Sequence, residues 1–138
     1  MTHDVTKTVK SEILHLDSLA KKDGWVFEYD SEMDSLEWGL PKMPRNARLY
    51  NVNKEISLYL TPKGLVKGVF IEYYRNNFVE HNKKFKKFTK LLTSRKKDGH
   101  VALKVRNKKE DEVGHYIDDL AKEVTIVVCS SKSGSFAF

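Results

Sequence analysis

The sequence predicts an α+β fold, in which an antiparallel β-meander carries packed helices and is followed by a C-terminal strand, helix and strand. Three observations lead to this class: apolar residues recur at helical spacing near the start, alternate with a period of two through the middle, and return to helical spacing after residue 75. The chain has 138 residues, of which 40% are apolar, enough for one buried core. We predict a single domain over residues 1–138, with the meander at 25–75, a basic helix plus the strand-helix-strand at 76–138, and a flexible tail at 130–138.

The first segment, residues 4–22, is predicted to be one amphipathic helix. Its apolar positions recur every three or four residues, with polar residues between them. They are Val5, Val9, Ile13, Leu16 and Ala20. Gly24 follows this segment and can take the left-handed conformation that closes a helix, so we expect the helix to end there.

Alternating residues predict a run of antiparallel strands joined by short turns from residue 25 onward. Trp25, Phe27 and Tyr29 would share one side of the first strand, as a half-buried strand requires. The predicted strands cover residues 25–30, 35–38, 48–52, 56–60 and 65–74. Gly64 suits the turn after the fourth of these strands, and Gly68 marks either a bulge or a close packing point.

After residue 75 the apolar positions again have helical spacing, and lysines stand between them. Phe78, Phe85, Phe88 and Leu92 are predicted to form one apolar stripe that packs on the sheet and leaves a basic face in solvent. Further along, we expect a strand around residues 101–105, a helix over 110–122 and a last apolar strand over 124–129. A strand, helix and strand of this length could form a right-handed parallel crossover.

Positive charge is concentrated in one part of the chain. Twelve basic residues and a single acid, Asp98, lie between Lys83 and Lys109 and give +11, whereas the other residues, 13 basic and 18 acidic, carry −5 of the total of +6. This asymmetry is typical of a protein that meets nucleic acid or another polyanion, although ordinary solvated helices also carry many lysines. The candidate contact residues are Lys83, Lys84, Lys86, Lys87, Lys90, Arg95, Lys96 and Lys97.

The sequence contains no catalytic signature. Glycine-rich phosphate loops, nucleophile elbows and dinucleotide fingerprints are absent. The single cysteine, Cys129, ends an apolar run, so we expect a buried, inert thiol rather than a nucleophile. The five histidines lack the spacing of a zinc site. We therefore assign no catalytic residue, cofactor or metal, although catalytic residues assembled from distant positions would leave no local signature.

Three alternating carboxylates, Asp30, Glu32 and Asp34, have the spacing of the first ligands of a calcium loop. The pattern fails because Ser35 stands where the loop needs glycine and Pro41 stands where it needs a bidentate glutamate. A weak cation site on one side of a strand is conceivable. A solvated turn, whose Asp and Ser side chains bond nearby backbone amides, explains these residues better.

The apolar runs and the cysteine count bear on the compartment. The longest apolar runs fall far short of the roughly 20 residues that cross a bilayer. The first four residues show neither a basic nor an apolar signal region, and one cysteine cannot form an internal disulfide. We expect a cytoplasmic location and no membrane partner.

Three short motifs lie within the predicted meander. Residues 29–36 follow the pattern Y-D-x-E-x-D-x-L, residues 54–60 are KEISLYL and residues 64–72 are GLVKGVFIE. Together they resemble a small prokaryotic family known only as a domain of unknown function, over residues 25–75. The resemblance implies a compact antiparallel meander with Gly64 and Gly68 at turn or bulge positions, and it implies no reaction and no ligand. This sequence departs from the family pattern in an insertion at 40–45, in the preceding helix and in the basic region that follows.

Two functions are consistent with these features. The first is a non-enzymatic binding or regulatory protein whose basic surface contacts nucleic acid or another polyanion. Because the phenylalanines of the basic helix share its apolar stripe, contact would be mainly with phosphates and would have little sequence specificity. The alternative is a protein-interaction module or a homodimer that uses a sheet edge or an exposed aromatic patch and binds no nucleic acid. Phosphate binding would weaken steeply as salt rises, whereas edge pairing would not.

Overall fold

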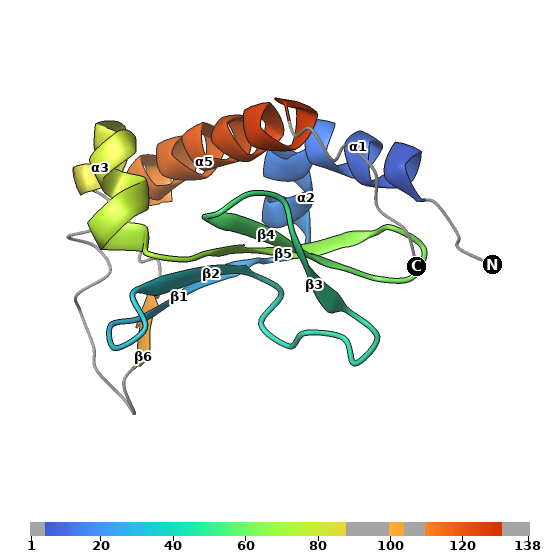
Figure 1. Ribbon diagram of the computed structural model, residues 1–138, viewed down its shortest axis with the longest axis horizontal. Coiled ribbons are helices and arrows are strands. Elements are labelled where there is room, and N and C mark those ends of the chain that lie inside the picture. Colours follow the sequence, from blue (N-terminus) through green and yellow to red (C-terminus); the bar gives the residue numbers. More distant parts are fainter. Residues whose placement is uncertain (1–4, 88–99, 104–109, 131–138) are drawn as a thin grey trace.

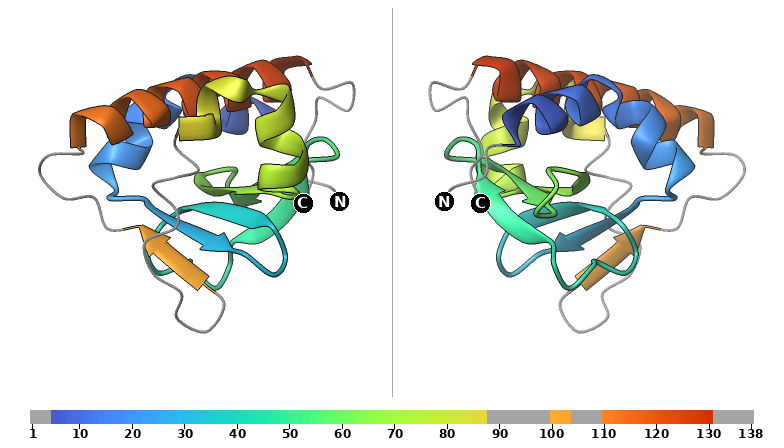
Figure 2. Two further views of the ribbon diagram at one scale, coloured as in Figure 1. Left: turned by 90° about the vertical axis from the view of Figure 1, so that its left-hand side faces the viewer. Right: turned by 90° about the vertical axis from the view of Figure 1, so that its right-hand side faces the viewer.

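The structure, a computed structural model, describes residues 5–87, 100–103 and 110–130. A six-stranded sheet in the order β3-β4-β5-β2-β1-β6 forms one layer, and the helices form a second layer on one of its faces (Figure 1). Figure 2 shows from two opposite sides that the described helices lie together on this face. The predicted α+β class is confirmed.

Two short helices, α1 (Thr6–Leu14) and α2 (Leu16–Lys22), open the chain. The predicted single helix is wrong at His15, where the backbone leaves the helical region with φ −119° and ψ 27°. The apolar stripe is nevertheless buried as predicted, with Val9, Ile13, Leu16 and Ala20 at most 2% exposed. A left-handed Gly24 (φ +65°) then turns the chain into the sheet.

The strands are β1 (Val26–Asp30), β2 (Ser35–Gly39), β3 (Arg48–Asn51), β4 (Ile56–Leu60), β5 (Val66–Ile71) and β6 (His100–Leu103). All pairings are antiparallel, and β1–β2, β3–β4 and β4–β5 are neighbours in both sequence and space, as in the predicted meander. The sheet departs from simple chain order at two points, because β5 lies between β4 and β2, and β6 pairs with β1. The loop after β2 therefore carries the chain past β5 and β4 to the outer edge at β3.

Alternation along the strands separates the two faces of the sheet. The buried face, which packs under the helices, includes Phe27, Tyr29, Leu36, Trp38, Ile56, Leu58, Leu60, Val69 and Ile71. The Phe27 ring stacks on the Trp38 ring with centroids 5.6 Å apart, and the Trp25 ring meets Trp38 edge to face with centroids 5.0 Å apart. The predicted side-sharing of Trp25, Phe27 and Tyr29 is confirmed, since all three are buried.

Gly64, which precedes β5, and Gly68, which lies within it, have the predicted roles. Gly64 has φ +84° and its N–H bonds the carbonyl of Thr61 at 2.9 Å, which closes the turn between β4 and β5. Gly68 lies at a bulge, because the register shifts between Tyr59 and Leu60, and it also packs directly against Gly39 of β2.

The C-terminal region differs from the prediction. A single helix, α5 (Glu110–Ser130), spans the range for which we expected a helix and then a strand at 124–129, so no strand-helix-strand unit forms. The strand that precedes it, β6, pairs with β1 in antiparallel fashion, which rules out the parallel crossover. Leu120, Val124 and Val128 lie four residues apart and are each at most 1% exposed. Because this spacing places all three on one face of a helix, their burial outweighs the strand preference of the apolar run.

Helix α5 lies beside α1 and α2 across the sheet (Figure 1). Of the expected tail at 130–138, Ser130 ends this helix, and residues 131–138 lie outside the described residues. Within the described part of the chain, no helix is both long enough and apolar enough to cross a bilayer.

Candidate functional site

The basic segment begins on a short helical stretch at one end of the sheet. The stretch consists of the π-helical turn η1 (Tyr74–Phe78), α3 (Val79–His81) and the 3-10 turn η2 (Lys83–Phe85). The predicted continuous helix is wrong here, because the backbone of Asn82 leaves the helical region at φ −132° and ψ 69°. The backbone N–H and the side-chain Nδ2 of Asn82 both donate to the carbonyl of Phe78 at 3.0 Å, which closes the first helix and lets the chain turn.

Aromatic rings anchor this stretch in the core. Tyr74, Phe78 and Phe85 are at most 1% exposed, and their successive ring centroids lie 5.7 and 5.3 Å apart. On a continuous helix, positions seven apart would be separated by about 10.5 Å along the axis. The break in the helix therefore brings the two phenylalanine rings into contact. Their predicted place in the core is confirmed, whereas Phe88 and Leu92 lie outside the described residues.

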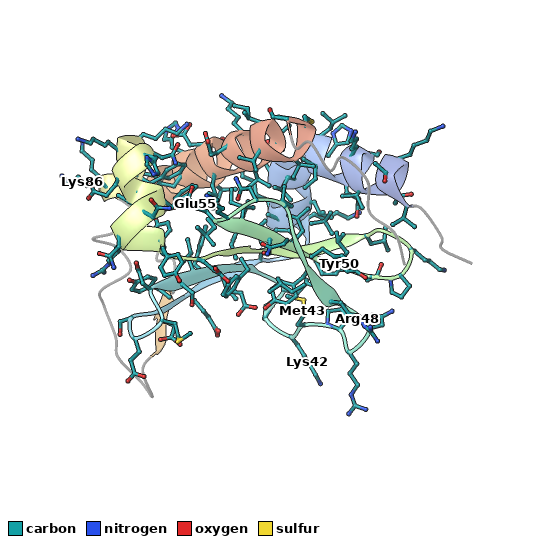
Figure 3. The ribbon with its side chains drawn as sticks, in the orientation of Figure 1. Lys42, Met43, Arg48, Tyr50, Glu55 and Lys86 are labelled. Atoms are coloured by element: carbon teal, nitrogen blue, oxygen red, sulfur yellow. The ribbon has the colours of Figure 1, made fainter. Side chains whose placement is uncertain are left out.

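Four of the eight predicted contact residues are described, and all four are exposed. They are Lys83, Lys84, Lys86 and Lys87. The Nζ atom of Lys84 lies 3.9 Å from Oε2 of Glu123 on α5 and 5.4 Å from the ring centroid of Phe85. For the other three lysines, no carboxylate among the described residues lies within ion-pair distance. Figure 3 shows Lys86 on the outer side of the α3–η2 stretch.

The remaining predicted contact residues, Lys90, Arg95, Lys96 and Lys97, lie outside the described residues. The described part thus presents a compact basic turn, defined here as residues 83–87, whose one aromatic side chain points inward. Flexible ammonium groups can meet phosphates as point charges, without the paired geometry that an arginine would impose. The basic turn is therefore suited to anionic backbones and offers no ring of its own for stacking.

A buried carboxylate fixes the start of the helical stretch. Asp34, in the turn between β1 and β2, is 8% exposed, and its two oxygens accept the backbone N–H groups of Arg75 at 2.9 Å and Asn76 at 3.0 Å. It also accepts the hydroxyl of Tyr29 at 2.5 Å, and its carbonyl accepts the N–H of Tyr74 at 2.8 Å. An anion placed on free N–H groups at the start of a helix is favourable, so this contact sets the direction in which η1 leaves the sheet.

The same contacts act on the Tyr29 phenol. Burial, followed by the hydrogen bond to Asp34 and the charge of that carboxylate, raises the pKa of Tyr29 well above its usual range. The Arg75 guanidinium, 4.8 Å from the ring centroid, acts in the opposite direction and is outweighed. The hydroxyl therefore remains a donor to Asp34 throughout the physiological pH range.

The three alternating carboxylates do not converge on one site. Oδ1 of Asp30 accepts the N–H groups of Glu32 at 3.0 Å and Met33 at 3.1 Å, so the hydrogen-bonded turn is confirmed. The interpretation as a solvated turn is wrong for Asp34, which is buried because the amides of η1 cover it. Among the described residues, no cluster of three or more His, Cys, Asp or Glu side chains is arranged to hold a metal.

The prediction of a buried Cys129 is wrong. The residue lies on helix α5, one position after the buried Val128, and its side chain is exposed. A strand ending at this position would have placed the thiol in the core, whereas the helical repeat turns it outward. Its low reactivity stays a prediction.

The sheet face away from the helices carries a shallow depression of about 90 Å³. Glu28 and Glu37, directly opposite each other on β1 and β2, line it together with Gly39 and Met43. Burial and a hydrogen bond to Glu37 raise the pKa of the Tyr59 phenol above its usual range, which keeps that phenol protonated. The depression is much smaller than the roughly 300 to 1,000 Å³ of typical small-molecule sites, so it offers room for waters rather than for a substrate.

One exposed aromatic residue beside the helical stretch is not singled out by the sequence pattern. Tyr73 is 57% exposed and adopts φ +51°, immediately before η1. The predicted strand runs to Tyr74, whereas β5 ends at Ile71, so the alternation gives no information about this residue. The one sequence signal for an exposed ring here is the Tyr73–Tyr74 doublet. Because neighbouring side chains point in different directions, burial of the Tyr74 ring leaves the Tyr73 ring in solvent.

Comparison with known proteins places the chain in no family. No family model matches the sequence, and neither a curated protein nor a solved structure is significantly similar to it.

Proposed function

We propose that this protein is a non-enzymatic binding protein whose basic segment, Lys83 to Lys109, contacts nucleic acid through its phosphates. The observation that carries the proposal is the segregation of charge, with +11 on this segment against −5 on the rest of the chain. Every lysine of the segment whose side chain is described is exposed, and only Lys84 is paired with a described carboxylate. A basic patch on an otherwise acidic body is the electrostatic footprint of a polyanion-binding protein.

The chemistry of the basic turn supports backbone contact rather than base reading. Phe78 and Phe85 are buried, so neither can stack on a base, and a lysine ammonium meets a phosphate as a point charge. Contacts to phosphates position a protein on nucleic acid without reading its sequence. The cysteine usage is compatible with the reducing cytoplasm, which we propose as the location.

A second candidate function is pairing with another protein through the outer edge of β3. Strand β3 is an end strand of the described sheet, and Leu49 on it is 45% exposed. An unpaired edge can accept a further strand through main-chain hydrogen bonds. This mode would depend little on salt, and replacing Leu49 with lysine should abolish it.

The test compares salt dependence in two matched triple variants. Fluorescence anisotropy with labelled DNA and RNA across a salt series gives the slope of log affinity against log salt, which is about 0.9 per duplex phosphate neutralised. Replacing Lys83, Lys86 and Lys87 with Gln should reduce that slope by up to roughly three. The control variant replaces Lys7, Lys54 and Lys63, three exposed lysines outside the basic segment, with Gln, so both triple variants lose the same net charge.

The control variant should keep the wild-type slope if the basic turn is the contact surface. Equal loss in both variants would mean that only overall charge matters. If the wild-type protein bound neither DNA nor RNA at low salt, the lysines would be a solvated face and the proposal would be wrong.

A further inference from the structure

Tyr73 is an aromatic side chain that the fold holds outside the core at the start of the stretch leading to the basic turn. Its side chain is 57% exposed, whereas the next residue, Tyr74, is fully buried. Its backbone is left-handed, with φ +51°, a conformation that is uncommon for any residue except glycine and asparagine-like residues and costly for a bulky one.

The contacts around Tyr73 explain why this conformation persists. Its carbonyl accepts the N–H groups of Asn77 at 2.8 Å and Phe78 at 3.0 Å, which ties it to the first turn of η1. The following N–H, of Tyr74, donates to the carbonyl of Asp34 at 2.8 Å. The peptide group between Tyr73 and Tyr74 is thus held at both its carbonyl and its N–H, and the N–H of Glu72 donates to the carbonyl of Glu55 at 2.8 Å, so the direction in which the Tyr73 side chain leaves the backbone is defined.

Tyr73 stands just before the helical stretch η1–α3–η2, and the basic turn stands at its other end. Two ring-to-ring steps, of 5.7 Å and 5.3 Å, lead from Tyr74 through Phe78 to Phe85. Tyr73 precedes the first of these residues, and Lys84 precedes the last. The whole stretch occupies one end of the molecule (Figure 1). A small single-strand-binding domain covers about 4 to 16 nucleotides, so one strand can follow the whole stretch from Tyr73 to the basic turn.

We propose, building on the nucleic-acid function above, that the ligand is a single strand and that Tyr73 stacks on one of its unpaired bases while the lysines of the basic turn contact the neighbouring phosphates. In a duplex each base is already stacked on its neighbours and turned away from the backbone, so a surface tyrosine has no face to meet. Unpaired bases present such a face, and stacking on it tolerates any base. The combination of an exposed ring with exposed ammonium groups therefore selects strandedness rather than sequence.

The test uses two substitutions at position 73. Tyr73→Asn removes the ring and keeps a residue that tolerates the left-handed conformation, so its melting temperature should not fall below that of the wild type. Tyr73→Phe keeps the ring and serves as the matched control. Each protein is titrated into a labelled 15-nucleotide oligothymidine, into the same length of strand with abasic sites throughout, and into a DNA duplex.

For oligothymidine, Tyr73→Asn should weaken binding roughly 5- to 150-fold, the equivalent of about 1 to 3 kcal/mol for one stacked base, whereas Tyr73→Phe should bind like the wild type. Binding of Tyr73→Asn to the abasic strand and to the duplex should stay within about twofold of the wild type, with an unchanged salt slope.

Three results would overturn the proposal, and they are distinguishable. If Tyr73→Asn bound oligothymidine like the wild type while the triple lysine variant still bound weakly, stacking would be wrong and phosphate binding would stand. An equal loss on the abasic strand or on the duplex would show that the ring does not act on bases. No binding by the wild type to any of the three probes would reject both proposals, and sedimentation of Tyr73→Asn beside the wild type would then show whether the ring belongs to a protein interface.

Discussion

The side chain of Asp34 accepts hydrogen bonds from the Tyr29 hydroxyl and from the N–H groups of Arg75 and Asn76, and the last two partners lie 41 and 42 residues away in sequence. Replacing it with alanine should remove the cap of η1 and leave the buried hydroxyl of Tyr29 without its acceptor, at a cost of about 2 to 4 kcal/mol. Asp34→Asn should cost less, because asparagine tolerates φ +51° and its carbonyl can still accept one of these bonds. Urea denaturation of both variants measures the difference. Equal losses would mean that the charge, rather than the shape, of the side chain matters.

The raised pKa of Tyr29 predicts a loss of stability in alkali. An unfolded tyrosine ionises near pH 10, whereas the buried phenol does not, so this contribution is fully present below pH 10 and declines as the pH rises above it. Tyr29→Phe should flatten the alkaline limb of the stability curve, although it lowers stability at pH 7 by removing the hydrogen bond to Asp34. Thermal melts between pH 8 and pH 11 test this. A wild-type curve that stays level above pH 10 would contradict the raised pKa.

At the scale of single residues, the sequence identifies the motif around Asp34 and only part of its chemistry. The role of Asp30 is local, because its amide partners are two and three residues away, and it was predictable from turn propensities. The amide partners of Asp34 lie 41 and 42 residues further along the chain. No local pattern contains that information, since it depends on where η1 meets the turn between β1 and β2.

Gly39 of β2 and Gly68 of β5 lie opposite each other and allow the two strands to approach closely. A Cβ added to Gly39 would lie 2.8 Å from the Cα of Gly68 and 2.9 Å from the carbonyl oxygen of Lys67, both of them backbone atoms. A Cβ on Gly68 would come no closer than 3.1 Å, the nearest atom being the flexible end of Met43. Gly39→Ala should therefore destabilise the protein by about 1 to 3 kcal/mol and by more than Gly68→Ala does.

Chemical denaturation of Gly39→Ala and Gly68→Ala gives the comparison directly, and Gly24→Ala is not a suitable control because its φ of +65° adds strain of its own. A larger loss of stability for Gly68→Ala would contradict this ranking. It would mean that the Met43 and Tyr59 side chains near Gly68 move aside less easily than the backbones of β2 and β5.

At the scale of elements, the helix α5 shows where sequence reasoning fails. The run Val124 to Val128 is rich in β-branched residues and favours a strand by propensity. It is helical because a four-residue repeat of apolar positions begins well before it, at Tyr116 and Leu120, and continues through it. Packing on α1 and α2 then outweighs the local preference, and the outward positions, such as Ile126, are left 59% exposed.

At the scale of the whole molecule, α5 packs against α1 and α2 and so connects the C-terminal helix with the start of the described chain. Its apolar contacts should contribute far more to the free energy of unfolding than its surface charges do. Leu120 is 1% exposed, and Leu120→Ala should cost about 2 to 5 kcal/mol. The ion pair between Lys21 and Asp118 spans 2.9 Å, but both side chains are about half exposed, so Lys21→Ala should cost at most about 1 kcal/mol. Urea denaturation midpoints of the two variants provide the measurement, and a comparable loss in both would contradict this ranking.

Local patterns in the sequence are enough to predict the class of the fold, the five strands from Val26 to Ile71, the helical stripe of the first segment and the concentration of positive charge after residue 82. These follow from short-range periodicity and composition, which act within a few residues. Packing between distant segments sets the position of β5 between β4 and β2, the single C-terminal helix, the break at Asn82 and the burial of Asp34. It also decides which tyrosine of the 73–74 doublet faces solvent. Each of these depends on contacts between segments tens of residues apart, whose packing energy overrides local preference. The C-terminal helix has a local signal as well, the four-residue apolar repeat from Tyr116 to Val128, but packing on α1 and α2 is needed for it to outweigh the strand preference.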